Sequence, residues 1–262
     1  MVAPPFSEAL LTGASSGLGR AIAVELGRRG VFVHLIARRE DQLERTREEI
    51  RSAGGDAAVH AGDVTDGPWL DRVVADVSAR PALDLVVAGA GVAESGARED
   101  TRLGRTHTVL EVNLVAAART LEVALPAMRE RGRGTLAALS SLAGLRGLPT
   151  AAAYCASKAG LSTWLESLRG ELHGTGLRVC DVRPGFVRTA LTARNRFPMP
   201  FLLEPEDAAR RTVDGLASGR AVIEFPRRLA WPMRAAARLL PHALWRGLTS
   251  PRGPAAVVQR DR

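Results

Sequence analysis

The sequence predicts an α/β fold, a single doubly wound domain built on a seven-stranded parallel sheet. Short apolar segments typical of buried strands alternate along the chain with longer segments of helical periodicity. With 262 residues, the chain has room for one sizeable domain of this class. Its 46% hydrophobic and 24% charged content is typical of a globular protein. Strands that alternate with helices are joined by right-handed crossovers, so we expect helices on both faces of the sheet.

The elements follow one another in a regular order. We expect strands at residues 7–12, 31–37, 57–61, 83–88, 135–140, 177–182 and 221–225. Helical spacing of apolar positions predicts helices at residues 17–29, 40–53, 106–131, 150–173 and 206–218. This order is that of a Rossmann-type domain over residues 1–225. Residues 226–262 form a basic, amphipathic C-terminal extension in this interpretation.

Charge, cysteines and hydropathy exclude several classes of function. The formal net charge is +8, but the cations are single and paired arginines spread along the chain, and no nucleic-acid-binding motif accompanies them. We therefore expect no nucleic-acid partner. Cys155 and Cys180 lack metal-ligand spacing, and the five histidines have no ligand-spaced partners, so we expect no metal. No apolar run is long enough to span a membrane and no basic leader begins the chain, which favours a cytoplasmic protein.

The loop after the first expected strand is rich in glycine. Ligands of doubly wound sheets bind beyond the carboxyl ends of the strands, and here that loop reads TGASSGLG, residues 12–19. Glycines allow a sharp turn and a close approach to a pyrophosphate, which the amides of the next helix can bind. The cofactor-binding residues expected in this loop are Gly13, Ser15, Ser16, Gly17, Leu18 and Gly19.

The same segment also matches GxSxG, which would make Ser15 the nucleophile of a hydrolase. Position argues against this interpretation. The hydrolase nucleophile follows several strands, whereas only one expected strand precedes Ser15, and no later Asp and His stand out as its partners.

The loops after the second and third expected strands indicate the type of dinucleotide. An NAD site has a carboxylate near the end of the second strand, whereas an NADP site has arginine for the extra phosphate. The carboxylate position is Ala37 here, and Arg38 and Arg39 follow, so we favour NADP over NAD. Both arginines would also suit an exposed surface that binds no cofactor. Asp63, beside Val64, is placed to reach the adenine, although a turn or helix-capping role fits it equally well.

Tyr154 and Lys158 are the single tyrosine and the single lysine of the chain. Their spacing of four places both on one face of a helix. Lowering the pKa of a tyrosine by about three units, toward neutrality, requires roughly 4 kcal/mol of differential stabilisation of its phenolate form. An ammonium about 4 Å away supplies an energy of that order at an effective dielectric constant of about 20. Lysine also offers three donors, which could bind ribose hydroxyls while the ammonium faces the phenol.

Taken together, these motifs resemble the short-chain dehydrogenase/reductase family over residues 6–225. The matching segments are TGASSGLG, Asn113 in EVN, SSLAG at 140–144, YCASK at 154–158 and RPGFVRT at 183–189. The resemblance implies hydride transfer between a nicotinamide and a carbonyl carbon. It implies that Ser141 holds the substrate oxygen and that Tyr154 is the acid/base. Lys158 would bind ribose and lower the pKa of the tyrosine, and Asn113 would hold a relay water.

The resemblance implies further cofactor contacts and one departure. The additional contact residues are Ala88, Gly89, Pro184, Gly185, Val187 and Thr189. The family's NNAG reads AGAG at residues 88–91, so other groups must replace the hydrogen bonds of both asparagines. In this family the helices that carry Asn113 and Tyr154 form the usual subunit contact, which implies a homodimer or homotetramer.

Two segments concern the kind of substrate and contact with a membrane. Residues 189–203 contain Phe197, Met199, Phe201 and Leu202, which favour a lipophilic carbonyl or alcohol substrate, unless this segment packs on its own core. Residues 226–248 mix arginines with tryptophan and leucine. This segment could contact a membrane at the periphery, cover the substrate entrance, or pack on the domain or on a partner subunit. A non-catalytic dinucleotide-binding protein or a membrane-surface binding protein remains the alternative function.

Overall fold

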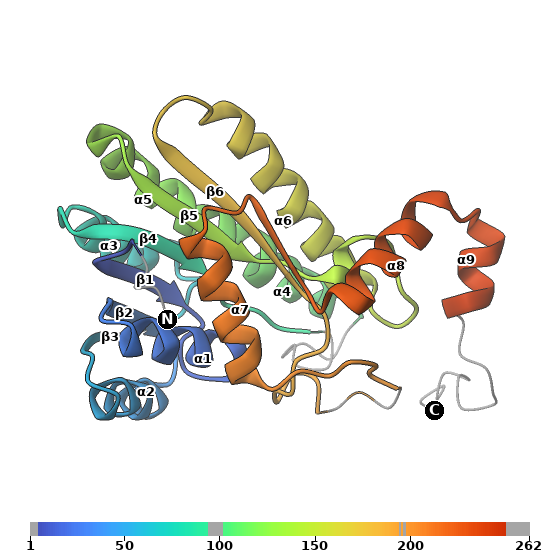
Figure 1. Cartoon of the computed structure of the whole chain (residues 1–262), viewed down its shortest axis with the longest axis horizontal. Helices are drawn as coiled ribbons and strands as arrows, with labels where there is room; N and C mark the ends of the chain where they lie inside the picture. The colour runs from blue at the N-terminus through green and yellow to red at the C-terminus, as the bar shows by residue number, and fades with distance from the viewer. Residues whose placement is uncertain (1–4, 94–101, 194, 196–197, 250–262) are drawn as a thin grey trace.

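A seven-stranded sheet forms the centre of the protein. The computed structural model describes residues 5–93, 102–193, 195 and 198–249 (Figure 1). The strands are β1 (Glu8–Thr12), β2 (Phe32–Ala37), β3 (Ala57–Ala61), β4 (Leu83–Ala88), β5 (Gly134–Leu139), β6 (Leu177–Pro184) and β7 (Val222–Phe225). They lie in the order β3-β2-β1-β4-β5-β6-β7, and every neighbouring pair is parallel. The doubly wound, seven-stranded sheet expected from the sequence is confirmed.

Helices cover both faces of this sheet. They are α1 (Gly17–Arg28), α2 (Glu40–Ser52), α3 (Gly67–Ser78), α4 (Arg102–Leu110), α5 (Ala116–Arg131), α6 (Ala152–Glu171), α7 (Pro205–Ala217), α8 (Arg227–Leu239) and α9 (His242–Thr249). In Figure 1, α1, α2 and α7 lie on one side of the strands, and α3, α5 and α6 lie on the other. Apolar side chains from each group of helices form a separate core cluster with one face of the sheet.

The helix predicted at residues 106–131 differs in the structure. It begins at Arg102 as α4, passes through a π-helical turn at Glu111–Val115 and continues as α5. A π turn holds one more residue than an α-helical turn, so it rotates the side chains of that turn relative to the rest of the helix. Asn113 lies in this turn and is completely buried.

Strand β6 is longer than predicted. It runs to Pro184 because Arg183 and Pro184 continue the pairing with Glu224 and Phe225 of β7. Val182 already pairs with Leu139, the last residue of β5, so the extension carries β6 two residues beyond the end of that neighbouring strand.

The strand order reverses at β1, which lies between β2 and β4. The carboxyl ends of β1 and β4 therefore flank the topological switch point, where doubly wound proteins bind their ligands. Beyond β7, the short helices α8 and α9 extend away from the body of the molecule at the right of Figure 1. Within the described ranges, no helix combines the length and the hydropathy that crossing a membrane would require.

Candidate active site

The glycine-rich loop packs closely against the loop that follows β4. Gly13 has φ +75°, and a Cβ atom built on it would lie 2.7 Å from both the carbonyl oxygen of Gly89 and the amide nitrogen of Ala90. Gly17 has φ +57°, which also favours glycine. A Cβ on Gly19 would overlap the carbonyl oxygen of Gly13. These glycines are therefore required by the turn itself and by the contact between the two loops.

Thr12, the last residue of β1, holds the loop that departs from the family pattern. Its buried Oγ1 accepts hydrogen bonds from the backbone N–H of Gly89 (3.0 Å) and of Ala90 (3.2 Å). Ala88 is itself buried at the end of β4. Thr12 thus satisfies two backbone groups of the AGAG segment. Thr12 belongs to the glycine-rich motif, and its position at the end of the first strand is the one sequence signal that indicates this role.

Asn113 also holds the loop after β4. Its Oδ1 accepts from the N–H of Val92 (2.8 Å), and its Nδ2 donates to the carbonyl oxygen of Val92 (2.9 Å) and to Ser157 Oγ (3.1 Å). Ser157 Oγ in turn donates to the carbonyl oxygen of Tyr154 (2.8 Å). The side chain of Asn113 therefore connects the loop after β4 to helix α6. Its role toward a relay water stays a prediction.

Tyr154 and Lys158 lie on one face of α6, as their spacing predicts. The Nζ atom of Lys158 is 5.7 Å from the centroid of the Tyr154 ring. The lysine side chain reaches the end of β5, where Nζ donates to the carbonyl oxygen of Leu139 at 2.7 Å. Burial lowers the pKa of Lys158 to about 8, while the negative charge of Asp181 acts in the opposite direction. The structure thus buries the single lysine of the chain beside its single tyrosine.

Ser141 follows β5 and begins a short 3₁₀ turn, Leu142–Gly144. Its Oγ accepts from the N–H of Ala143 (3.1 Å) and donates to the carbonyl oxygen of Pro184 (3.4 Å). A Cβ on Gly144 would lie 2.8 Å from the carbonyl carbon of Lys158, so this turn packs directly on α6. Ser141, Tyr154 and Lys158 therefore gather beyond the carboxyl ends of β5 and β6.

Of the residues expected after β2 and β3, Arg39 contacts the glycine-rich loop, and Arg38 lies near Asp63. Arg39 Nη2 donates to Ser15 Oγ at 3.4 Å, and Arg38 Nη1 lies 3.7 Å from Asp63 Oδ2. Asp63 Oδ1 accepts from both the N–H and the hydroxyl of Thr65, so this aspartate stabilises a turn. The neighbouring Val64 is buried. The Arg39 guanidinium beside the Ser15 hydroxyl, with Arg38 next to it in the sequence, is chemically suited to bind a phosphate.

The segment after β6 packs against the glycine-rich loop. The N–H of Gly185 donates to the carbonyl oxygen of Phe225 at 2.8 Å. Val187 is buried and forms an isolated parallel bridge with Leu203. A Cβ on Gly17 would lie 3.1 Å from the methyl group of Thr189, which places this segment against the glycine-rich loop.

The apolar segment proposed for substrate contact is described in part. Phe201 is 50% exposed, and the sulfur of Met199 accepts from Asn195 Nδ2 at 3.4 Å. Leu202 is partly buried. Phe197 lies outside the described residues.

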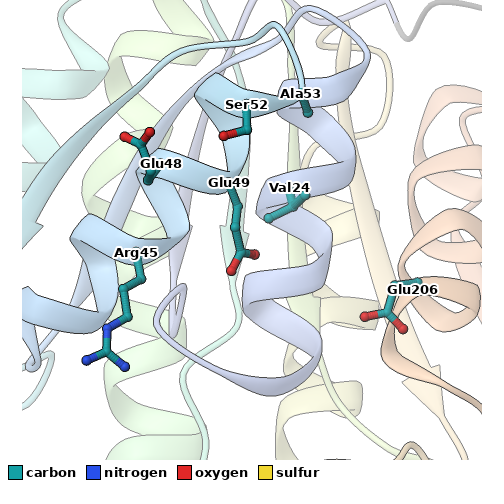
Figure 2. Close-up of a pocket in the computed structure, with 7 residues that line it drawn as sticks. All are labelled: Val24, Arg45, Glu48, Glu49, Ser52, Ala53 and Glu206. Atoms are coloured by element: carbon teal, nitrogen blue, oxygen red, sulfur yellow. The ribbon is translucent and has the colours of Figure 1, made fainter.

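A surface hollow elsewhere on the protein has a different character. Figure 2 shows it beside α1 and the C-terminal half of α2, with Glu206 of α7 at its rim. Four of its seven lining residues are charged, and one of these, Glu49, pairs with Arg20. It lies away from the carboxyl ends of the strands. In the described part of the chain, no three His, Cys, Asp or Glu side chains are arranged to hold a metal ion.

Comparison with known proteins identifies close relatives. A family model described as short chain dehydrogenase matches residues 7–198. An uncharacterized oxidoreductase of Myxococcus xanthus is 47% identical over 92% of this chain and 95% of that protein. The ketoacyl reductase HetN of Nostoc is 35% identical over 74% of this chain and 68% of that protein. The solved structure of an actinorhodin polyketide ketoreductase variant with NADPH is 30% identical, with a TM-score of 0.74, and the match covers 88% of this chain and 99% of that one.

Proposed function

Because this chain belongs to the short-chain dehydrogenase family, we propose that it is an NADP-dependent oxidoreductase acting on a lipophilic ketone or secondary alcohol. One observation carries the proposal. The ammonium of Lys158 is buried 5.7 Å from the Tyr154 ring, on a helix that packs directly on the turn of Ser141. This arrangement can hold a carbonyl oxygen and deliver a proton to it.

A nicotinamide held by the residues of the glycine-rich loop and by Lys158 would supply hydride to the carbonyl carbon in reduction and would accept it in oxidation. In the direction of reduction, the Tyr154 hydroxyl gives its proton to the substrate oxygen, while the Ser141 hydroxyl donates a hydrogen bond to the same oxygen. In oxidation, Tyr154 takes the proton back. Asn113 keeps the backbone of Tyr154 in register through Ser157, and in our proposal it also holds the relay water.

Lys158 has two roles in this proposal. Its pKa of about 8 lies above neutral pH, so the side chain is mostly charged there and its field favours the deprotonated form of Tyr154. Nζ has three donors, and Leu139 O takes one of them. The other two donors are available for the ribose hydroxyls of the cofactor.

The choice of NADP rests on Arg38 and Arg39. Arg39 contacts Ser15 of the glycine-rich loop, Arg38 lies beside Asp63, and the similar actinorhodin ketoreductase variant was solved with NADPH. Replacing Arg38 with Ala removes a charged donor to the additional phosphate, so NADPH affinity should fall by roughly 10- to 100-fold. NADH affinity, measured by the same fluorescence titration, should hardly change. Equal losses for the two cofactors would show that Arg38 does not recognise this phosphate.

The exposed surface of Phe201 and the names of two similar proteins support the proposed substrate class. Phe201 exposes half of its surface near the segment that follows β6. Two of the similar proteins carry the names ketoacyl reductase and polyketide ketoreductase, which favours a ketone with an apolar chain. A screen of aliphatic, aromatic and sterol-like ketones and alcohols, followed by nicotinamide absorbance with both cofactors, tests this choice.

The proton-transfer role is tested by Tyr154→Phe. This change removes the hydroxyl and keeps the ring, so NADPH affinity should persist while turnover falls by about 10²- to 10⁴-fold. Circular dichroism of the variant checks that the fold is retained. Unchanged turnover would remove Tyr154 from the mechanism. NADPH binding by the wild-type protein without turnover of any carbonyl in the screen would favour the non-catalytic alternative.

We also propose that the protein forms a homodimer or homotetramer through α5 and α6. A groove between these helices includes Leu114, Val115, Gly160 and Trp164 in its lining, and Val115 is 47% exposed. An apolar groove on these helices would be covered in such an assembly. Light scattering coupled to size-exclusion chromatography measures the assembly, and a monomer at all concentrations would contradict the proposal.

A further inference from the structure

The C-terminal helices α8 and α9 expose large apolar side chains. Among the described residues, seven large hydrophobic side chains are exposed, and four of them lie on these two helices. They are Trp231 (66% exposed), Leu239 (79%), Leu244 (57%) and Leu248 (64%). Such a concentration on one short segment indicates a surface that another body covers.

The opposite side of these helices is fixed to the domain. Trp245 is buried, and its Nε1 donates to the carbonyl oxygen of Gly147 at 2.8 Å. The guanidinium of Arg146 lies 5.0 Å from the centroid of the Trp245 ring and donates to the carbonyl oxygen of Leu240 at 2.7 Å. Arg234 of α8 pairs with Glu224 of β7. One side of these helices is thus packed on the domain, and the exposed apolar side chains do not take part in that packing.

The exposed side is also strongly basic. Residues 226–249 contain five arginines and no Asp or Glu. Apart from Arg234, these arginines are exposed, and none of them forms an ion pair with a described residue: Arg227, Arg228, Arg238 and Arg246. On α8, Arg227, Trp231 and Arg238 follow one another at spacings of four and seven, which places a tryptophan between two arginines on one stripe.

We propose that this C-terminal surface, formed by α8 and α9, docks the protein on an anionic lipid bilayer. Helices of 13 and 8 residues are too short to span a bilayer, so they would lie in its interface. Tryptophan and leucine would enter the boundary between headgroups and acyl chains, while the arginines bind lipid phosphates.

The charge distribution argues against a second copy of the chain as the occupant. A two-fold contact would place this surface against itself and bring eight unpaired arginines together. No carboxylate within residues 226–249 could neutralise them. An anionic bilayer satisfies both the arginines and the apolar side chains.

Docking would also bring the proposed site close to the lipid. Arg146 and Gly147, which hold α8 and α9, follow the turn of Ser141 by only a few residues. A lipophilic carbonyl dissolved in the membrane would then be near the loop that holds its oxygen.

Sedimentation with vesicles tests the proposal on the full chain. The protein should bind phosphatidylcholine vesicles that contain phosphatidylglycerol, should bind pure phosphatidylcholine vesicles much more weakly, and should be released by salt. The triple variant Arg227→Gln, Arg228→Gln, Arg238→Gln should lower the apparent affinity by on the order of a hundredfold. As a matched control, Arg72→Gln, Arg211→Gln, Arg220→Gln removes the same charge from other exposed positions and should leave binding nearly unchanged.

A second variant tests the apolar part. Trp231→Ser with Leu239→Ser should also weaken vesicle binding, while NADPH affinity is retained in every variant. The proposal is overturned if the wild-type protein does not bind anionic vesicles or if both triple variants bind equally. It is also overturned if the double variant changes only the oligomeric state. Because NADPH binding is measured separately, failure here is distinct from failure of the proposed oxidoreductase function.

Discussion

Replacing Lys158 with Met should stabilise the folded protein at neutral pH, even though it removes a residue that the proposed activity needs. The Lys158 side chain is only 4% exposed, and burial lowers its pKa from an ordinary 10.5 to about 8. Methionine has a similar length and shape without the charge. The substitution therefore removes the cost of burying an ammonium and leaves the packing largely intact.

The magnitude follows from the difference in pKa between the two states. A shift of about 2.5 units corresponds to on the order of 3 kcal/mol of unfolding free energy. Loss of the hydrogen bond from Nζ to the carbonyl oxygen of Leu139 offsets about 1 kcal/mol of this gain. We therefore expect Lys158→Met to raise the unfolding free energy by roughly 2 kcal/mol at neutral pH.

The pH dependence of stability due to Lys158 has the opposite sign to that of a lysine whose pKa is raised by an ion pair. Between about pH 8 and the ordinary lysine pKa, the unfolded chain binds the proton and the folded chain does not, so stability due to this group rises with pH. The penalty is fully present below pH 8 and is lost above the unfolded pKa of about 10.4. The difference between wild type and variant should therefore shrink across this window.

Two measurements check the prediction. Denaturant titrations of both proteins at a series of pH values give the difference in unfolding free energy, in which the titration of other groups cancels. Lys158 is also the only lysine, so isotope-labelled lysine gives a single side-chain NMR signal whose pKa can be followed directly. A variant that is less stable at neutral pH by a pH-independent amount, together with a lysine signal that titrates near 10.4, would refute the reasoning.

Two further predictions concern the backbone around the site. Thr12→Val should lower the unfolding free energy by about 2 to 4 kcal/mol, because it leaves two backbone donors of the loop after β4 without their acceptor. Thr12→Ser keeps the hydroxyl and should cost about 1 kcal/mol by denaturant titration, and equal losses would exclude the hydrogen bonds as the cause. Gly144→Ala should lower turnover at least tenfold, because its Cβ would push the 3₁₀ turn away from α6. Gly147→Ala is the control, since a Cβ there meets no atom within 4 Å, and similar kinetic losses in both variants would contradict this account.

Much of the fold could be predicted from the sequence because its signals are local. Each strand is a short apolar run, and each predicted strand is present with ends displaced by no more than two residues. The glycine-rich loop was equally predictable, since its positive φ angles and close contacts allow few other residues. The relation of Tyr154 to Lys158 followed from helical spacing alone.

The features that the sequence did not predict depend on contacts between segments that are distant along the chain. The π turn around Asn113 leaves the apolar pattern of its helix nearly unchanged, so periodicity indicated one continuous helix. Hydrogen bonds from Asn113 to Val92 and Ser157 accompany this turn, and no single-segment pattern contains them. The role of Thr12 was hidden for the same reason, because its partners lie in the loop after β4, about 77 residues further along the chain.

The charges around the site explain why burial dominates the pKa of Lys158. Asp181 is completely buried and is the acidic group whose field acts on this lysine. Its carboxylate is already engaged, because it accepts from Ser140 and lies 2.7 Å from Arg183 Nε. Arg183 pairs with this carboxylate, and the field of Asp181 at Lys158 opposes the effect of burial without overcoming it.

Lys158 consequently has no carboxylate of its own within the described residues, and a backbone carbonyl is its hydrogen-bond acceptor. A lysine with a dedicated acidic partner would be more stable, but its field at the Tyr154 ring would be cancelled. The arrangement gives up stability at one buried position and in exchange leaves beside the phenol a positive charge that is in no ion pair with a described carboxylate, where the proposed proton transfer requires it.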